Sequence, residues 1–235
     1  MDGTLFLFDI DGTLLSGATR AHAAALRLAL TRVHGVDPDA AGIRVEAAGR
    51  TDGEIARLIL IDAGVSAERI DERADEVREE ACRIFAETCE ADLSSHLIAG
   101  IEDLLAWLGG QQGVLLALVT GNFEPIARLK LRRAGIGRWF EPGQGGFGSD
   151  SEDRIALPPI ARRRAGDHSG HPHPRERTVL IGDTPRDIAC AHADAVRCVA
   201  VTTGPFPADE LTAADVVVGD AGELRVTLEQ WIEAA

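Results

Sequence analysis

The sequence is poor in several features that define other classes of protein. It has no tyrosine, a single lysine (Lys130) and no apolar stretch approaching the roughly 18–20 residues that a membrane helix requires. No signal peptide is recognisable at its start, and its cysteines show no CxxC spacing. These absences favour a cytoplasmic protein with reduced thiols and no membrane partner. The cysteines are Cys82, Cys89, Cys190 and Cys198.

Positive charge is also scarce. The net charge of -14 argues against a nucleic-acid partner, because a phosphate backbone requires a basic surface. It does not exclude a small phosphorylated substrate, whose charge one metal ion and one or two cationic side chains can offset. The length of 235 residues suits one hydrophobic core with a smaller inserted or appended unit. The oligomeric state cannot be inferred from these numbers.

Short apolar runs alternate with helical patterns over most of the chain. This alternation predicts an α/β fold, with a Rossmann-like parallel sheet covered by helices on both faces. The expected strands are Leu5–Phe8, Val114–Val119, Thr178–Ile181, Cys198–Val201 and Val216–Val218, and the expected helices between them are Ile126–Ala134, Pro159–Ala165 and Asp187–Ala193.

The region between residues 16 and 94 interrupts this rhythm, because it contains no convincing strand. Its patterns predict helices over Thr19–Val33, Asp52–Ala63 and the charged run Ser66–Glu90. We therefore expect residues 16–94 to form an inserted α-helical cap, and residues 1–15 and 95–235 to form the catalytic core. Hinges are expected near Ser16 and within Asp92–Ser95.

Two aspartates follow the first apolar run directly. Asp9 and Asp11 stand at the carboxyl end of the predicted strand, which is where ligands bind in an open parallel sheet. Two residues apart, their side chains leave the strand on the same side, and they would repel each other at neutral pH. A hard divalent ion such as Mg²⁺ suits oxygen ligands of this kind.

Polar residues follow three further segments of the core. Thr120-Gly121-Asn122 ends one predicted strand, Arg154 precedes a helix that begins with proline, and Asp183 and Asp187 follow another strand. Each motif is weak alone, but together, in this order and at separate strand ends, they indicate one shared site.

Simpler interpretations exist for these residues. Asp9 and Asp11 could merely cap a turn or helix, and Thr120 could belong to an ordinary turn. A calcium-binding EF-hand also starts with D-x-D, but it requires a glutamate at its twelfth position, where this sequence has Arg20. The presence of a second acidic pair makes a purely structural role for Asp9 and Asp11 improbable.

With its DxDGT motif from Asp9 to Thr13 and its GDxxxD motif from Gly182 to Asp187, the chain resembles the haloacid dehalogenase-like hydrolase superfamily. It is most similar to the branch with a helical cap that includes phosphoglycolate phosphatases and β-phosphoglucomutases. The resemblance covers nearly the whole chain. It implies that Asp9 is a nucleophile that forms an aspartyl-phosphate, and that Asp11 is the general acid and base.

The resemblance also implies a ligand set. Asp9, the backbone carbonyl of Asp11, and Asp183 would hold Mg²⁺, with Asp187 as a further acidic partner, direct or through water. The phosphoryl oxygens would be bound by residues of the second and third motifs, namely Thr120, Gly121, Asn122 and Arg154.

The third motif departs from the family, which usually has a lysine there. Arg154 occupies the matching position, and its permanently charged fork suits phosphate. Alternatively, Arg154 pairs with Glu152 or Asp153 on the surface. Lys130 lies on the helix after Thr120, and the rise of that helix predicts a distance of about 10 Å or more from the strand end.

Within the family, two branches fit poorly. Phosphonatases form an imine with a cap lysine, and this cap has none; dehalogenases generally lack an acid at the position of Asp11. Phosphate ester chemistry remains. The sequence therefore predicts a Mg²⁺-dependent phosphatase of a small phosphorylated metabolite. The alternatives are a sugar phosphomutase related to β-phosphoglucomutase, and a signalling module that keeps its aspartyl-phosphate.

Two residues of the cap are candidates for a role in specificity. Arg50 opens a predicted helix and resembles the substrate-facing loop of capped relatives, although it could simply be a solvated residue beside a helix cap formed by Thr51 or Asp52. His22 falls where a closing cap helix could face the site, although a position at the surface is expected. A Pro- and Gly-rich loop over residues 165–177 is expected to be flexible and solvated rather than metal-binding; it carries His168, His171 and His173.

Overall fold

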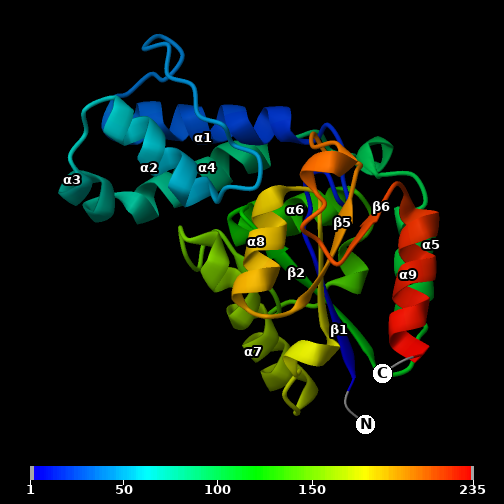
Figure 1. Cartoon of the computed structure of the whole chain (residues 1–235). Coiled ribbons are helices and arrows are strands. Elements are labelled where there is room, and N and C mark those ends of the chain that lie inside the picture. The colour runs from blue at the N-terminus through cyan, green and yellow to red at the C-terminus, as the bar shows by residue number, and fades with distance from the viewer. Residues whose placement is uncertain (1–2, 234–235) are drawn as a thin grey trace.

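The computed structural model describes residues 3–233, and its centre is a six-stranded parallel sheet with strand order β3-β2-β1-β4-β5-β6 (Figure 1). The central strands are short runs of Leu, Ile, Val and Phe that are buried on both faces, which is typical of a parallel sheet. The strands are β1 (Thr4–Phe8), β2 (Val114–Thr120), β3 (Gly146–Phe147), β4 (Thr178–Gly182), β5 (Arg197–Val201) and β6 (Val216–Val218).

Helices cover both faces of the sheet. Phe6 and Phe8 of β1 belong to one apolar cluster with residues of α5, α6 and α9, and Leu5 and Leu7 belong to another with residues of α7 and α8. The alternation of side chains along a strand explains this division. The helices of the core are α5 (Ile101–Gly109), α6 (Glu124–Arg133), α7 (Leu157–Ser169), α8 (Pro185–Ala193) and α9 (Ala221–Glu233).

Residues 16–94 contain helices and no strand, as predicted. The helices form a unit beside the carboxyl edge of the sheet (Figure 1). Leu30, Ile59 and Phe85 are buried in a separate apolar cluster, which Ile126 of α6 joins. The predicted fold class, an α/β core with an inserted helical cap, is confirmed. The cap helices are α1 (Thr19–His34), α2 (Asp52–Asp62), α3 (Ala67–Glu72) and α4 (Ala74–Thr88).

Several local predictions were wrong. The charged run 66–90 is two helices rather than one, because the chain leaves helical geometry at Arg73, whose φ is -117°. Residues 165–169 continue α7, which ends where Gly170 adopts a left-handed conformation. The prediction also omitted β3, α5 and α9. Short 3₁₀ segments complete the fold: η1 (Ser94–His96), η2 (Gly137–Trp139), η3 (Arg154–Ala156), η4 (Arg175–Arg177) and η5 (Ala208–Glu210).

The register of the three central strands brings the polar motifs to one edge. Phe8 pairs with Leu118 on one side and with Ile181 on the other. Asp9, Thr120 and Asp183 therefore emerge from neighbouring strands at nearly the same height. No helix within residues 3–233 has the length and apolar character needed to cross a membrane.

Candidate active site

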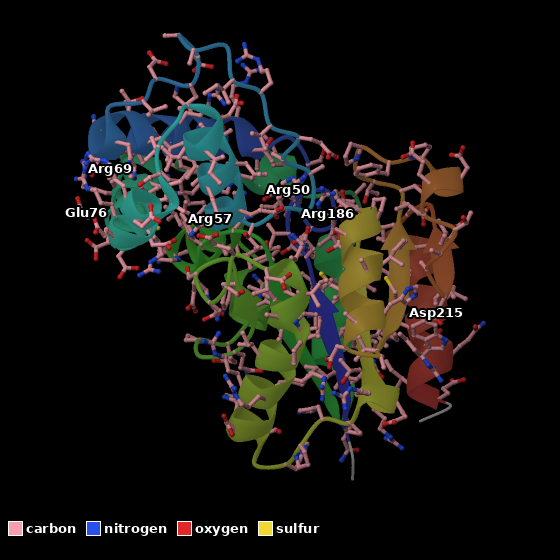
Figure 2. The ribbon with its side chains drawn as sticks, turned by 60° about the vertical axis from the view of Figure 1, so that its left-hand side comes forward. Arg50, Arg57, Arg69, Glu76, Arg186 and Asp215 are labelled. Carbon is pink, nitrogen blue, oxygen red and sulfur yellow. The ribbon has the colours of Figure 1, made fainter. Side chains whose placement is uncertain are left out.

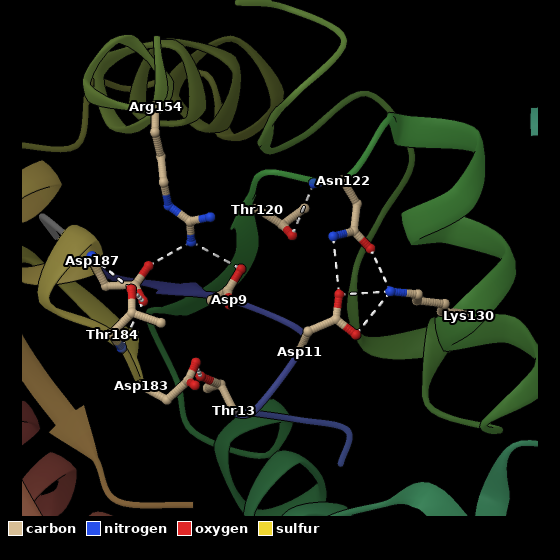
Figure 3. Close-up of polar contacts among 10 residues, drawn as sticks. All are labelled: Asp9, Asp11, Thr13, Thr120, Asn122, Lys130, Arg154, Asp183, Thr184 and Asp187. Carbon is tan, nitrogen blue, oxygen red and sulfur yellow. Dashed lines mark hydrogen bonds and ion pairs between the residues drawn. The ribbon is translucent and has the colours of Figure 1, made fainter. Parts of the chain in front are cut away.

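Three buried carboxylates meet at the carboxyl edge of the sheet (Figure 3). Asp9 follows β1, Asp183 follows β4 and Asp187 lies in the first turn of α8. One carboxylate oxygen from each lies within 4.8 Å of the other two, and within residues 3–233 no other group of three acidic, His or Cys side chains comes as close. This is a donor set of the kind that hard divalent cations prefer.

The surroundings of Asp183 support a bound cation. Its Oδ2 is buried without a hydrogen-bond partner, while its Oδ1 accepts a bond from the Thr13 hydroxyl at 3.1 Å. A Cβ at Gly12 would lie 2.1 Å from that Oδ2, and a Cβ at Gly204 would lie 1.7 Å from it. Gly12 also has φ of +91°, which disfavours any other residue. The two glycines thus keep side chains away from an oxygen that needs a ligand.

Burial and crowded negative charge together raise the pKa values of two of these carboxyls, Asp9 and Asp183. Burial raises the pKa of Asp9, and the charges of Asp187 and Asp11 add to the effect, although Arg154 opposes it. Burial likewise raises the pKa of Asp183, together with the charges of Asp9 and Asp187. A carboxylate cluster of this kind requires protons or a cation to be stable.

Arg154 lies inside the site rather than on the surface. Its Nη2 is 3.1 Å from Asp9 Oδ1 and 2.5 Å from Asp187 Oδ1, and only 6% of its side chain is exposed. Burial opposes its charge, but the two aspartates outweigh burial and raise its pKa. The alternative partners are engaged elsewhere: Glu152 binds Arg57, and Asp153 accepts a bond from the Ile155 amide.

Both carboxylate oxygens of Asp187 already accept hydrogen bonds. Its Oδ2 accepts bonds from the backbone amide and the hydroxyl of Thr184, which form a capping box at the start of α8. Its Oδ1 accepts from Arg154. This arrangement suits a residue that orients Arg154 and reaches a cation from one side.

Asp11 points away from the triad, towards Lys130 (Figure 3). Lys130 Nζ lies 2.8 Å from Asp11 Oδ1 and 2.6 Å from Asp11 Oδ2, and the Asn122 amide donates to Asp11 Oδ2 at 3.0 Å. Burial opposes ionisation of Asp11, but Lys130 outweighs it and lowers the pKa of the carboxyl. Two aspartates that are two residues apart thus have opposite electrostatic environments.

The expected separation of Lys130 from the strand end was wrong. Helix rise alone locates a backbone atom, whereas the long side chain of Lys130 returns to Asp11 from the inner face of α6. Lys130 is fully buried, on the same face as Ile126 one turn earlier, which is 1% exposed. That i, i+4 spacing was the signal in the sequence that could have identified it.

The hydrogen bonds of Lys130 also determine which ring nitrogen of His22 carries the proton. An ammonium group has only donors, and those of Lys130 reach Asp11, Asn122 Oδ1 at 2.8 Å and His22 Nδ1 at 3.2 Å. His22 Nδ1 therefore accepts, so its Nε2 carries the proton and donates to Asp52 Oδ2 at 2.9 Å. The prediction of a surface histidine was wrong, because His22 is only 7% exposed.

The start of α2 docks the cap on the core. Asp52 Oδ2 accepts a bond from the Phe123 amide at 2.7 Å, and the Asp52 amide donates to the Gly121 carbonyl at 2.8 Å. A Cβ at Gly121 would lie 2.1 Å from the carbonyl oxygen of Arg50, so only glycine permits this approach. Thr51 Oγ1 donates to the Glu152 carbonyl at 2.7 Å.

Charged side chains reinforce the same border. Figure 2 shows Arg50, Arg57 and Arg186 where the cap meets the core. Arg57 Nη2 lies 3.0 Å from Glu152 Oε1. Arg50 is paired with Glu54, and Thr51 caps α2, which matches the alternative interpretation of this segment as a helix start. Arg50 nevertheless lines the same cavity as Asp9 and Asp11.

The second motif closes the site on the β2 side. Thr120 is fully buried and Asn122 is 8% exposed, and both lie beside Asp9 and Asp11 (Figure 3). The structure therefore brings together all the core residues chosen from the sequence.

The histidine cluster lies apart from this site. His173 is buried, and its ring is 5.1 Å from that of His171. Burial lowers the pKa of His173. Hydrogen bonds to Ser169 hold both rings, so His173 does not belong to a solvated loop as expected.

Comparison with known proteins now decides the family. The profile of the haloacid dehalogenase-like hydrolases matches residues 6–192. The chain belongs to this family. The resemblance stated from the motifs is thereby confirmed, as is the prediction of a hydrolase.

Several individual proteins are similar to this chain. The chain is 32% identical to a phosphoglycolate phosphatase of Pectobacterium atrosepticum, over 90% of this chain and 86% of the relative. It is 31% identical to the tyrosine-protein kinase PtkA of Mycobacterium tuberculosis, over 95% of this chain and 72% of that protein. Its fold is similar to that of a β-phosphoglucomutase from Clostridium difficile, with a TM-score of 0.69 and 18% identity over 100% of this chain and 99% of the other.

The crowded carboxylates predict a stability that depends on pH and on metal. A carboxyl whose pKa is raised by folding stabilises the protein while it is protonated, and this stabilisation is lost as the pH rises through its folded pKa. We expect the thermal midpoint of the metal-free protein to decrease as the pH is raised from about 5 to about 8. We expect Mg²⁺ to raise the midpoint more at the higher pH than at the lower one. Differential scanning calorimetry would measure this. Asp11 does not counteract the trend, because its pKa is lowered and it stays ionised across this range.

An equal Mg²⁺ shift at both pH values would contradict that expectation. Asp183→Asn is the informative variant, because it removes one carboxylate and should abolish most of the Mg²⁺ response. Asp103→Asn, which changes an exposed residue of α5, should leave the response intact.

The contacts of Lys130 predict a large loss of stability on its removal. Lys130→Met leaves the Asp11 carboxylate without a neighbouring cation, with the Asn122 side-chain amide as its remaining donor, and it leaves His22 Nδ1 and Asn122 Oδ1 without a donor. We expect the free energy of unfolding to fall by about 3 kcal/mol, the low end of the range for a broken buried pair, because the Asp11 side chain is 20% exposed. Urea denaturation would measure it. Arg132→Met, which removes an exposed cation from the same helix, should cost less than about 0.5 kcal/mol.

A double-mutant cycle separates this pair from general damage. Asp11→Asn combined with Lys130→Met should cost less than the sum of the single changes, with a coupling of about 1–3 kcal/mol. Additive costs would show that the contact contributes nothing of its own.

Proposed function

We propose that this protein is a Mg²⁺-dependent phosphatase that hydrolyses a small phosphorylated metabolite through an aspartyl-phosphate on Asp9. The observation that supports this best is the contrast between Asp9 and Asp11. Asp9 stands in a carboxylate cluster beside Arg154, whereas Asp11 is held apart by Lys130 and Asn122. One carboxylate is thus placed to bond with phosphorus and the other to move protons. The name of the Pectobacterium relative, a phosphoglycolate phosphatase, agrees with phosphate ester chemistry.

In the first step, a carboxylate oxygen of Asp9 attacks phosphorus in line with the ester oxygen. The new bond joins Asp9 to phosphorus, and the bond from phosphorus to the leaving oxygen breaks. Asp11, which is ionised beside Lys130 in the free protein, has to take up a proton when the substrate binds, and it transfers this proton to the leaving oxygen so that an alcohol departs. Asp11 then remains as the carboxylate that its contacts with Lys130 favour.

In the second step, the Asp11 carboxylate takes a proton from a water molecule, whose oxygen attacks phosphorus. The bond to Asp9 breaks, inorganic phosphate leaves and Asp9 is regenerated. Asp11 finishes this step protonated, and its contacts with Lys130 then favour release of that proton between turnovers. The same side chain thus serves as acid and then as base.

The remaining residues hold charge in place. Asp9, Asp183 and the backbone carbonyl of Asp11 would bind Mg²⁺, with Asp187 at its edge, and the ion would neutralise oxygens that gain negative charge. Thr120, the Gly121 amide and Asn122 would bind phosphoryl oxygens.

Arg154 takes the place of the usual lysine, because its Nη2 already lies beside Asp9. Residues 16–94 would act as the cap that opens for exchange and closes to exclude water, with Arg50 facing the substrate.

Replacing the nucleophile tests the mechanism. Asp9→Asn removes the attacking oxygen, so we expect phosphate release from p-nitrophenyl phosphate with Mg²⁺ to fall by at least about 10³-fold. Wild-type protein quenched in acid during turnover of a ³²P-labelled substrate should carry a base-labile label, and Asp9→Asn should carry none.

Asp103→Asn is the control and should label like the wild type. Full activity in Asp9→Asn would contradict the mechanism. A label that persists for minutes without phosphate release would instead indicate a signalling module, and isomerised sugar phosphate without released phosphate would indicate a mutase.

Replacing Arg154 tests its role at the phosphoryl group. Arg154→Ala removes a buried charge beside Asp9, so we expect kcat/KM for p-nitrophenyl phosphate to fall by about 10²–10³-fold and inhibition by inorganic phosphate to weaken. Arg154→Lys restores the charge without the planar fork of a guanidinium and should recover part of the loss.

Steady-state kinetics and phosphate inhibition constants provide the measurement. Unchanged kinetics in Arg154→Ala would place the third-motif function elsewhere. Circular dichroism should first establish that the variant is folded, because Arg154 also binds Asp187.

A further inference from the structure

A large cavity lies above the carboxylate cluster, between the core and the cap. Its volume is about 610 Å³, and Asp9, Asp11 and Asp183 form part of its floor. Cavities of roughly 300–1,000 Å³ enclose drug-sized ligands. The space is therefore greater than a phosphoryl group with a two-carbon leaving group requires.

The cap side of this cavity is mainly aliphatic. Its walls come from α1, α2 and the segment between them, and the described residues there include no Phe, Tyr or Trp. The apolar residues that line it there include Leu26, Val45, Ala47, Ala48, Ile55 and Ile59. Apolar walls favour apolar ligand surface, since burying such surface on both sides removes it from water.

The cationic side chains that line the cavity already have carboxylate partners. Arg27 binds Asp39 with Nη2 to Oδ1 at 2.7 Å, and Arg50 is paired with Glu54. Arg154 is held by Asp9 and Asp187 at the floor, where the phosphoryl group would bind. Among the described lining residues, no arginine is left to receive a second negative charge on the substrate.

Two polar residues of the cap that line the cavity, His22 and Asp52, also have hydrogen-bond partners. His22 accepts from Lys130 and donates to Asp52, and Asp52 accepts a second bond from the core. Asp52 further adds negative charge to the cap side. An anionic leaving group would thus meet aliphatic walls and a carboxylate, with no unpaired cation.

We infer that the leaving group of the substrate is an uncharged, mainly hydrocarbon alcohol, aryl-substituted or branched, rather than a carboxylated or phosphorylated one. This inference rests on the proposed function of the floor and specifies the other half of the same site. The phosphoryl group binds at the carboxylates and Arg154, and the hydrocarbon part lies against Ile55, Leu26 and Val45. The substrate class therefore differs from the one that the name of the Pectobacterium relative implies for that protein.

The first test compares benzyl phosphate with phosphoglycolate, using wild-type protein and Mg²⁺. Both esters release a primary alcohol, so the chemistry of the departing oxygen is similar while the remainder differs in charge and polarity. We expect kcat/KM to favour benzyl phosphate by at least ~10-fold. Equal or higher kcat/KM for phosphoglycolate would overturn the inference and leave the proposed function intact.

The second test measures binding and does not require turnover. Benzylphosphonate and phosphonoacetate differ only in a phenyl ring against a carboxylate, and neither can be hydrolysed. Calorimetry with Mg²⁺ should give at least ~10-fold tighter binding of benzylphosphonate. If this preference holds but no phosphate ester is hydrolysed, the proposed function fails and the inference about the cavity stands. If phosphonoacetate binds equally well or better, the inference fails.

Two arginine variants on α2 assign the effect to the cavity. Ile55→Arg introduces a cation into the wall and should weaken benzylphosphonate binding by ~10-fold while strengthening phosphonoacetate binding. Ile61→Arg, on the same helix at a residue that is 52% exposed, should change neither affinity. Val45→Arg provides a second variant in the wall in case Ile55→Arg does not fold. Equal effects of the wall variants and Ile61→Arg would overturn the inference.

Discussion

The main constraint on this structure is that the sheet brings several carboxylates into one small volume, where their mutual repulsion has to be offset. Asp9, Asp183 and Asp187 come from strand ends and a helix start whose positions the core fixes, so they cannot move apart. Arg154 offsets part of the charge, and a cation would offset the rest. Burial and this repulsion together raise the pKa values of Asp9 and Asp183, and the glycines beside Asp183 keep a place open for the ion.

A second, separate cation determines what Asp11 can do. Lys130 draws the Asp11 side chain away from the triad and keeps its charge from adding fully to the cluster. The same ammonium binds His22 of the cap, and His22 binds Asp52, which contacts the Phe123 amide. The one lysine of the chain is therefore a junction between the proton-transfer group and the cap, and its full burial follows from having three satisfied donors.

Much of this could be predicted from the sequence, and the failures have physical causes. Strands of Leu, Ile and Val that end in aspartate identified the sheet and the site edge, because both signals are local. The two-residue β3 is too short for any periodicity. Helix α5 was missed although Leu104, Leu105 and Leu108 follow a helical spacing. The burial of His22 and the reach of Lys130 depend on how the cap packs against α6, which is a property of three dimensions rather than of neighbouring residues.

The absence of a side chain at Gly121 has a consequence for the history of such proteins. The Gly121 carbonyl accepts a hydrogen bond from the Asp52 amide, and the lack of a Cβ at Gly121 leaves room for the Arg50 carbonyl. A cap taken from another family member would pack against the core in a different position unless these contacts were transferred with it. An exchange of caps by recombination therefore has to include the contacting residues of both the cap and the core. Proteins with a larger residue at this position must dock their caps through other contacts.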